Sequence, residues 1–212
     1  MQAGRSIVAV AGFASNVGKT SLASRLIAAL PGWEAIKVTK GHYRSCGKDP
    51  AACCVSHLLS DEPLILSGRD ANYSAGKDTA RFWDAGASNV HWVIATRQQV
   101  ADGVRTALAR VAPGAPGVVV EGTGFVVDVP ADVIVMVARP DSADIKPSAR
   151  RVFKMADFLF LSSDGPDTSA EVERLRAMLA AHGVTCEMPP VLRSLDVGRL
   201  VELIDRRCSI AR

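Results

Sequence analysis

The chain contains 212 residues, of which 48% are hydrophobic and 22% are charged, and its formal net charge is +3. This length predicts one domain over residues 1–212, and since no apolar run approaches the ~20 residues that cross a bilayer, we expect no membrane partner. The small net charge and the scattered Lys and Arg residues argue against a nucleic-acid partner. Residues 1–5 lead directly into an apolar run without room for a signal peptide, so we expect a cytoplasmic protein with reduced cysteines.

Short apolar runs alternate with helical patterns along the chain, which predicts an α/β fold: a three-layer sandwich with a mostly parallel central sheet. We expect strands at Ser6 to Ala11, Glu34 to Val38, Val90 to Ala95, Gly117 to Glu121, Val133 to Val137, Phe158 to Leu161 and Thr185 to Met188. We expect helices at Ser21 to Leu30, Asp78 to Ala85, Gln98 to Arg110, Ser169 to Ala181 and Leu195 to Arg206. The polar stretch from Ala138 to Pro147 is interpreted as a connecting loop, with closure over a ligand or partner docking as the alternatives.

A glycine-rich loop follows the first expected strand and leads into the first helix. It runs from Gly12 to Thr20 and ends in Gly18-Lys19-Thr20, with five residues between the two glycines where the usual motif has four. Backbone N–H groups at such a strand-to-helix turn favour phosphate, the lysine reaches the β- and γ-phosphates, and the threonine hydroxyl binds Mg²⁺. The pattern predicts binding of ATP or GTP by Gly12, Ala14, Ser15, Asn16, Val17, Gly18, Lys19, Thr20 and Ser21.

A second candidate segment is the buried strand Val118-Val119-Val120 with its continuation Glu121-Gly122-Thr123-Gly124. Ligands of open α/β sheets bind beyond the carboxyl ends of the strands, so Glu121 is expected near Mg²⁺ or its waters. The glycines leave room for phosphate or for a second substrate. The alternative interpretation is an ordinary strand-end turn with a solvated glutamate.

Cysteine and histidine gather between His42 and His57. If residues 50–59 are helical, Cys53 or Cys54 lies one turn from His57, and Cys46 or His42 would complete a tetrahedral Zn²⁺ site. The spacing matches no familiar zinc motif. Reduced thiols that pack as small hydrophobic side chains, or a redox pair, are the alternatives.

The glycine-rich loop together with Val120-Glu121-Gly122-Thr123-Gly124 resembles the SIMIBI class of P-loop NTPases that includes dethiobiotin synthetase and the amidating synthases of cobyrinic acid. Residues 76–87, Gly-Lys-Asp-Thr-Ala-Arg-Phe-Trp-Asp-Ala-Gly-Ala, are similar to a segment of the molybdopterin-guanine-dinucleotide biosynthesis adaptor family. The resemblance implies a Mg²⁺- and nucleotide-dependent protein of cofactor or metal-centre assembly, often a homodimer.

The resemblance also suggests roles for single residues. Lys37 follows the second strand where dethiobiotin synthetase has a lysine that contacts phosphate and substrate, and Lys40 is the alternative. Asp78 lies in a segment that similar proteins use as a mobile loop near Mg²⁺. Lys19, Lys37 and Glu121 are thus the candidate catalytic side chains, and Thr20, Glu121 and Asp78 are the candidate Mg²⁺ ligands.

Two motifs of the wider class are missing from this chain, and their absence limits which functions the resemblance implies. Guanine-selective members of the class carry Asn-Lys-x-Asp after a late strand, where this chain has Leu161-Ser162-Ser163-Asp164, so selectivity for GTP is not indicated. The loop also lacks the additional early lysine of the partitioning and nitrogenase-type ATPases. Two functions remain: a slow NTPase that acts as an adaptor for a client enzyme in molybdenum-cofactor-type assembly, and an ATP-dependent ligase that activates a carboxylate or carbamate.

Overall fold

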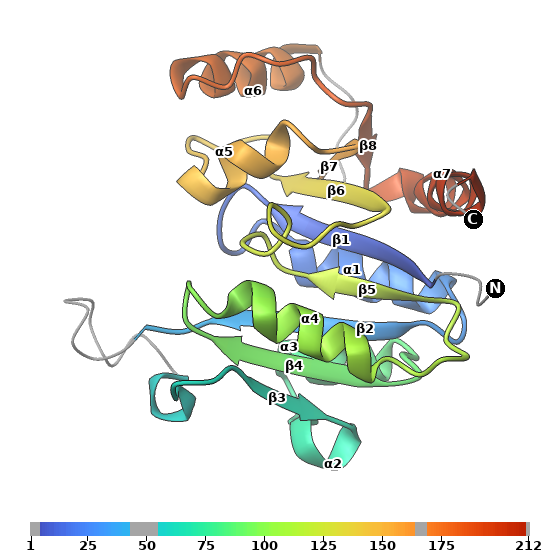
Figure 1. Ribbon diagram of the computed structural model, residues 1–212. Coiled ribbons are helices and arrows are strands. Elements are labelled where there is room, and N and C mark those ends of the chain that lie inside the picture. Colours follow the sequence, from blue (N-terminus) through green and yellow to red (C-terminus); the bar gives the residue numbers. More distant parts are fainter. Residues whose placement is uncertain (1–4, 43–54, 164–168, 211–212) are drawn as a thin grey trace.

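The computed structural model describes residues 5–42, 55–163 and 169–210. Its centre is an eight-stranded sheet with the strand order β3-β4-β2-β5-β1-β6-β7-β8 (Figure 1). All neighbouring strands are parallel except β3, which runs antiparallel to β4 at one edge. The strands are β1 (Ser6–Gly12), β2 (Glu34–Lys40), β3 (Leu64–Ser67), β4 (Val90–Ala95), β5 (Gly117–Glu121), β6 (Val133–Ala138), β7 (Phe158–Leu161) and β8 (Val191–Arg193).

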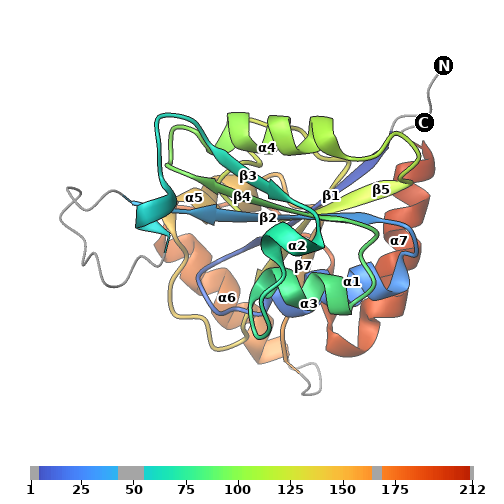
Figure 2. The same cartoon turned by 90° about the horizontal axis from the view of Figure 1, so that it is seen from below.

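The helices cover both faces of this sheet. One apolar core joins the sheet to α4 (Val100–Arg110), α5 (Pro147–Phe153) and α6 (Ser169–Ala181). A second core on the opposite face joins it to α1 (Lys19–Ala29), α3 (Asp78–Asp84) and α7 (Val197–Ile210). Figure 2 shows α4 on one side of the sheet and α1 and α3 on the other. The short helices are α2 (Arg69–Asn72), η3 (Ser56–Leu58) and η4 (Ser194–Asp196). The predicted three-layer α/β sandwich is confirmed, and no helix in the described ranges is long and apolar enough to cross a membrane.

The strand register brings charged residues together at the carboxyl ends of the central strands. Residues of β5 are apolar and buried as far as Val120, and the strand then ends in Glu121. In the β2–β5 pairing Lys37 lies directly beside Glu121, and in the β1–β5 pairing Val10 lies beside the same glutamate. Because β1 continues from Val10 to the glycine-rich loop, the loop and both charged residues lie together at the carboxyl ends of the central strands.

Several elements differ from the sequence-based expectations, among them the four-residue helix α2, which was not expected. The prediction of a strand at Thr185 to Met188 is wrong, because the last strand, β8, begins only at Val191. Just before it, the carbonyl oxygen of Pro190 accepts a hydrogen bond from Leu159 N. The edge strand β3 was not expected, because its four residues are only half-buried and give a weak pattern. Helix α5 was also not expected; Pro147 occupies its first turn, where a missing N–H costs nothing.

Helix α4 packs unusually close to the sheet at Gly103. A Cβ at Gly103 would lie 2.7 Å from Val93 Cγ1 and 3.0 Å from Pro63 Cβ. We therefore expect Gly103→Ala to lower the free energy of unfolding by about 1–3 kcal/mol, the usual cost of overpacking a core. The measurement is chemical denaturation. The matched control is Gly198→Ala in α7, where a Cβ meets no atom within 4 Å and alanine should be neutral or stabilising. Equal stability of the two variants would contradict this account of the α4–β4 contact.

Candidate functional site

The loop between β1 and α1 is shaped by two backbone positions in the left-handed region. Asn16 has φ 58°, and Gly18, which immediately precedes α1, has φ 97°. Gly12 leaves no space for a side chain, because a Cβ there would lie 2.8 Å from Lys19 Cδ. Within the part of the chain that the structure describes, the backbone N–H groups of residues 14–18 meet no hydrogen-bond acceptor. Open N–H groups at the start of an eleven-residue helix favour an anion.

Phe13 explains why this loop is longer than the usual motif. Its backbone continues the sheet by one residue, donating from N to Val137 O at 3.0 Å and accepting at its carbonyl oxygen from Lys146 N at 3.0 Å. The ring is fully buried and packs edge-to-face on Phe153, with 5.6 Å between the ring centroids. The additional residue is therefore an anchor that ties the loop to β6 and to the start of α5.

Two hydroxyl groups from other strands hold the remainder of the loop. Thr123 Oγ1, just beyond β5, accepts a hydrogen bond from Gly12 N at 3.0 Å. Ser162 Oγ, just beyond β7, donates to Val17 O at 2.6 Å. The Ser162 side chain also packs so closely on Gly18 that a Cβ there would lie 2.9 Å away. Ser162 thus supports the loop from the end of β7.

The Lys19 side chain bends back over the loop. Its ammonium group donates to Ala14 O at 2.7 Å. Burial lowers the pKa of Lys19 below its ordinary value, and the positive charges of Lys37 and Lys146 lower it further, although Glu121 and Asp78 oppose this shift. An anion bound next to this ammonium group would relieve the repulsion among the three lysines, which is the electrostatic setting that a phosphate requires.

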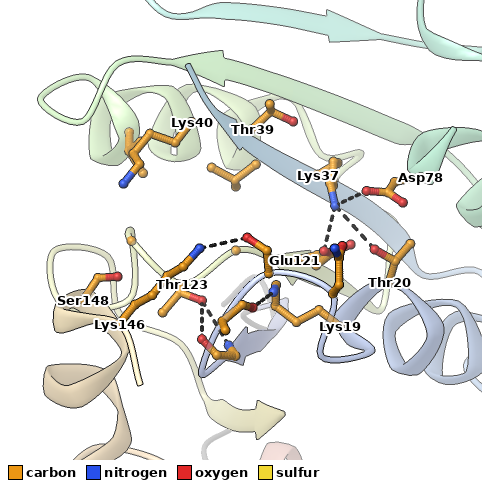
Figure 3. A pocket seen from close by; sticks show the side chains of 18 of the residues that line it. Lys19, Thr20, Lys37, Thr39, Lys40, Asp78, Glu121, Thr123, Lys146 and Ser148 are labelled. Carbon is orange, nitrogen blue, oxygen red and sulfur yellow. Dashed lines mark hydrogen bonds and ion pairs between the residues drawn. The ribbon is translucent and has the colours of Figure 1, made fainter. Parts of the chain in front are cut away.

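Lys37 connects the other candidate residues into one cluster (Figure 3). Its Nζ lies 2.7 Å from Glu121 Oε1, 2.5 Å from Asp78 Oδ2 and 3.5 Å from Thr20 Oγ1. Burial alone would raise the pKa of Asp78, but hydrogen bonds from Lys37 and Thr20, with the charges of Lys37 and Arg81, hold it below its ordinary value. Asp78 is therefore ionised at neutral pH, and the structure brings together four side chains that the sequence singled out separately.

The second carboxylate oxygen of Glu121 provides a test of whether the cluster fits a metal ion. Glu121 is 3% exposed, and its Oε2 is buried without a hydrogen-bond partner among the described residues. A buried carboxylate oxygen is costly to leave unpaired. Oxygen donors are the ligands that Mg²⁺ prefers, and it usually keeps several of its waters. The hydroxyl of Thr20 and the carboxylates of Glu121 and Asp78 therefore fit Mg²⁺ with part of its water shell.

A cleft of about 1180 Å³ opens over the carboxyl ends of the central strands. It reaches from the glycine-rich loop across the ends of β5 and β2 to residues that follow β4, and α5 forms a further wall. Most of the predicted nucleotide-binding residues line it, namely Gly12, Ala14, Ser15, Asn16, Gly18, Lys19, Thr20 and Ser21. Val17 does not; its side chain is buried in the core beneath the loop. Lys37, Asp78 and Glu121 also line the cleft, as does Lys40.

The predicted zinc ligands fall mostly outside the described residues. Cys46, Cys53 and Cys54 belong to the range 43–54, and His57 lies in η3. Among the residues that are described, no group of three or more His, Cys, Asp or Glu side chains is arranged to hold a metal ion. The zinc site therefore stays a prediction.

The sequence did not single out four basic residues that line the cleft: Arg81, Arg97, Lys146 and Arg151. Arg81 donates to Ser21 Oγ at 3.0 Å, and Lys146 Nζ donates to Ser15 Oγ at 2.8 Å. Arg81 lies in the segment 76–87 and Lys146 in the polar stretch from Ala138 to Pro147, but neither carries a motif of its own, and each reaches the loop across 60 or more positions of the chain. Pro147 was the available signal for Lys146, because proline in a first turn marks where a helix begins.

Comparisons with known proteins bear on the fold. No protein-family model matches the chain, and no curated protein sequence matches it. Among solved structures, the LAO/AO transport system kinase superposes with a TM-score of 0.52 at 16% identity, covering 99% of this chain and 62% of the kinase. The chain thus spans less than two thirds of that kinase. A nucleotide-binding protein from Archaeoglobus fulgidus in complex with ADP aligns with a TM-score of 0.42 at 14% identity, over 95% of this chain and 87% of that protein. With the sheet order and the glycine-rich loop, the first likeness shows that the chain has the fold of the P-loop NTPases.

Proposed function

We propose that the protein binds a nucleoside triphosphate together with Mg²⁺ in the cleft above β1, β5 and β2. The observation that carries this proposal is that Thr20, at the start of α1 and directly after Lys19, lines the same cleft as Glu121, whose buried Oε2 has no hydrogen-bond partner among the described residues. The open N–H groups and Lys19 supply the phosphate site, and the carboxylates supply the metal site. Both sites share one cleft, as phosphoryl-transfer chemistry requires.

Each side chain has a definite task in this arrangement. Lys19 and the backbone N–H groups from Ala14 to Thr20 hold the phosphates, and Thr20 with Glu121 and Asp78 would hold Mg²⁺. The ion, when bound, neutralises charge on the phosphate oxygens. Lys37 offsets part of the negative charge of Asp78 and Glu121 in the structure. Since a divalent cation would take over part of that balance, Lys37 becomes available to a transferred phosphoryl group or a substrate.

Two candidate functions follow from this site. An adaptor with slow NTP hydrolysis needs only the nucleotide site, and the similarity of residues 76–87 to the molybdopterin-guanine-dinucleotide adaptor family motivates this reading; α3 and Asp78 come from that segment. A ligase that activates a carboxylate or carbamate needs space for an acceptor. The length of the cleft, which continues past the phosphate loop to β2 and β4, favours the ligase.

Other parts of the proposal rest on the resemblance or on the sequence pattern alone. A homodimeric state, a cytoplasmic location, a client enzyme and a role in molybdenum-cofactor assembly stay predictions. The choice between ATP and GTP is equally open.

Removing the Lys19 ammonium group should weaken nucleotide binding without unfolding the protein. We expect Lys19→Ala to reduce the affinity for a fluorescent ATP analogue by about 10- to 100-fold, the loss of one charge-assisted hydrogen bond of roughly 1.5–3 kcal/mol. The control is Lys154→Ala, an exposed lysine that follows α5 and does not line the cleft. Circular dichroism verifies the fold of both variants. Unchanged affinity in Lys19→Ala would remove the phosphate-loop assignment.

Neutralising Glu121 should act on the metal rather than on the nucleotide itself. In Glu121→Gln, the gain in ATP affinity that Mg²⁺ produces over EDTA should fall by about 10- to 100-fold, as is usual when a residue supporting a metal is replaced. Affinity measured in EDTA should change little. The exposed Asp102, which pairs with Arg105 on α4, provides the control Asp102→Asn. A Glu121→Gln variant with the full Mg²⁺ effect would show that Glu121 does not support a metal ion.

A further inference from the structure

The cleft is somewhat larger than the usual pocket for one small ligand. Pockets for single small ligands measure roughly 300–1,000 Å³, and this cleft measures about 1180 Å³. Figure 3 shows its two ends: Lys37, Asp78 and Thr20 lie together at one end, and Lys40, Lys146 and Ser148 lie at the other. We call the second end the basic half and define it by Lys40, Arg97, Lys146 and Arg151.

The four basic residues reach this half from separate elements. Lys40 is the last residue of β2 and pairs in register with Ala95, the last residue of β4, so Arg97 emerges beside it two positions later. Lys146 directly precedes α5, and Arg151 lies one turn after Ser148 on that helix. Positions far apart in the sequence thus surround one space, which requires the complete fold.

The charges of the cleft are distributed unevenly. Asp78 and Glu121 are the carboxylates among the described lining residues, and both pair with Lys37 at the metal end. Arg97 and Arg151 are exposed and form no salt bridge within residues 5–42, 55–163 and 169–210. A cleft lined by one sign of charge concentrates ions of the opposite sign, and a guanidinium group binds a carboxylate or a phosphate through two parallel hydrogen bonds.

We propose that the basic half binds a second small anion, a phosphate monoester or a dicarboxylate, at the same time as the nucleotide. Arg97 and Arg151 are its principal contacts, and Lys146, which donates to Ser15 of the phosphate loop, stands between the two ligands. This inference rests on the proposed function in one respect only, namely that the first ligand is a nucleotide. It gives the acceptor of the ligase hypothesis a chemical class: a molecule with at least two negative charges.

The test is a calorimetric titration with glycerol 3-phosphate and, separately, succinate, because both probes bind Mg²⁺ weakly. Each is titrated into the protein alone and into the protein saturated with Mg²⁺ and the non-hydrolysable ATP analogue AMP-PNP. The variant is Arg97→Gln combined with Arg151→Gln. The control combines Arg199→Gln with Arg206→Gln, two exposed arginines of α7 that change the net charge equally and do not line the cleft.

We expect at least one probe to bind in the presence of AMP-PNP, and the Arg97/Arg151 variant to weaken that binding by about tenfold or more, the value of one charge-assisted hydrogen bond. The control should bind like the wild type, and AMP-PNP affinity should be similar in all three proteins. The probe that binds more tightly identifies phosphate or carboxylate as the preferred group.

Three outcomes would overturn the inference: no binding of either probe at millimolar concentration, equal binding in the Arg97/Arg151 variant, or displacement of the probe by AMP-PNP. The last result would place the probe in the phosphate loop. Failure of the proposed function looks different, because AMP-PNP itself would then not bind. In that case, probe binding that depends on Arg97 and Arg151 would still support an anion site.

Discussion

The pairing of Lys37 with Glu121 across β2 and β5 is the constraint around which the site is built. Glu121 ends a strand whose preceding residues are buried, so its carboxylate stands at 3% exposure and needs a positive partner. The parallel register supplies Lys37 at the adjacent position, and α3 adds Asp78 to the same ammonium group. Two carboxylates and one lysine are thereby fixed beside the first turn of α1. The Lys37–Glu121 pair is a consequence of sheet register, and the position of Asp78 is a consequence of how α3 packs.

The phosphate loop owes its shape to similar long-range anchoring. Phe13 extends the sheet toward β6 and α5, Thr123 supports Gly12, and Ser162 supports Val17. These contacts come from the ends of β6, β5 and β7, so the loop is held from both sides of β1. Preorganised N–H donors of this kind lose little conformational entropy on binding an anion, which is an advantage for a phosphate site. Lys146 joins this support to the basic half, since its backbone binds Phe13 and its side chain binds Ser15.

Motifs and hydrophobic patterns predicted those parts of the structure that depend on residues close together in the sequence. The order Gly18-Lys19-Thr20 after an apolar strand indicated the loop, and the buried run before Glu121 indicated a strand end near it. The contact between Asp78 and Lys37 could be suspected only through resemblance, because its geometry depends on where α3 packs. Arg97, Lys146 and Arg151 carry no motif and meet only in the folded chain. Proline at 147 and the proline pair before Val191 were readable signals for α5 and β8 that hydrophobic patterning alone does not capture.

The central claim is that one cleft joins a phosphate site to a metal site. Calorimetric titration of the wild-type protein with ATP and with GTP, each in Mg²⁺ and in EDTA, tests it most directly. The account predicts saturable binding of at least one triphosphate at about one molecule per chain, tighter in Mg²⁺ than in EDTA. Absence of binding for both nucleotides, or affinities that Mg²⁺ leaves unchanged, would contradict it.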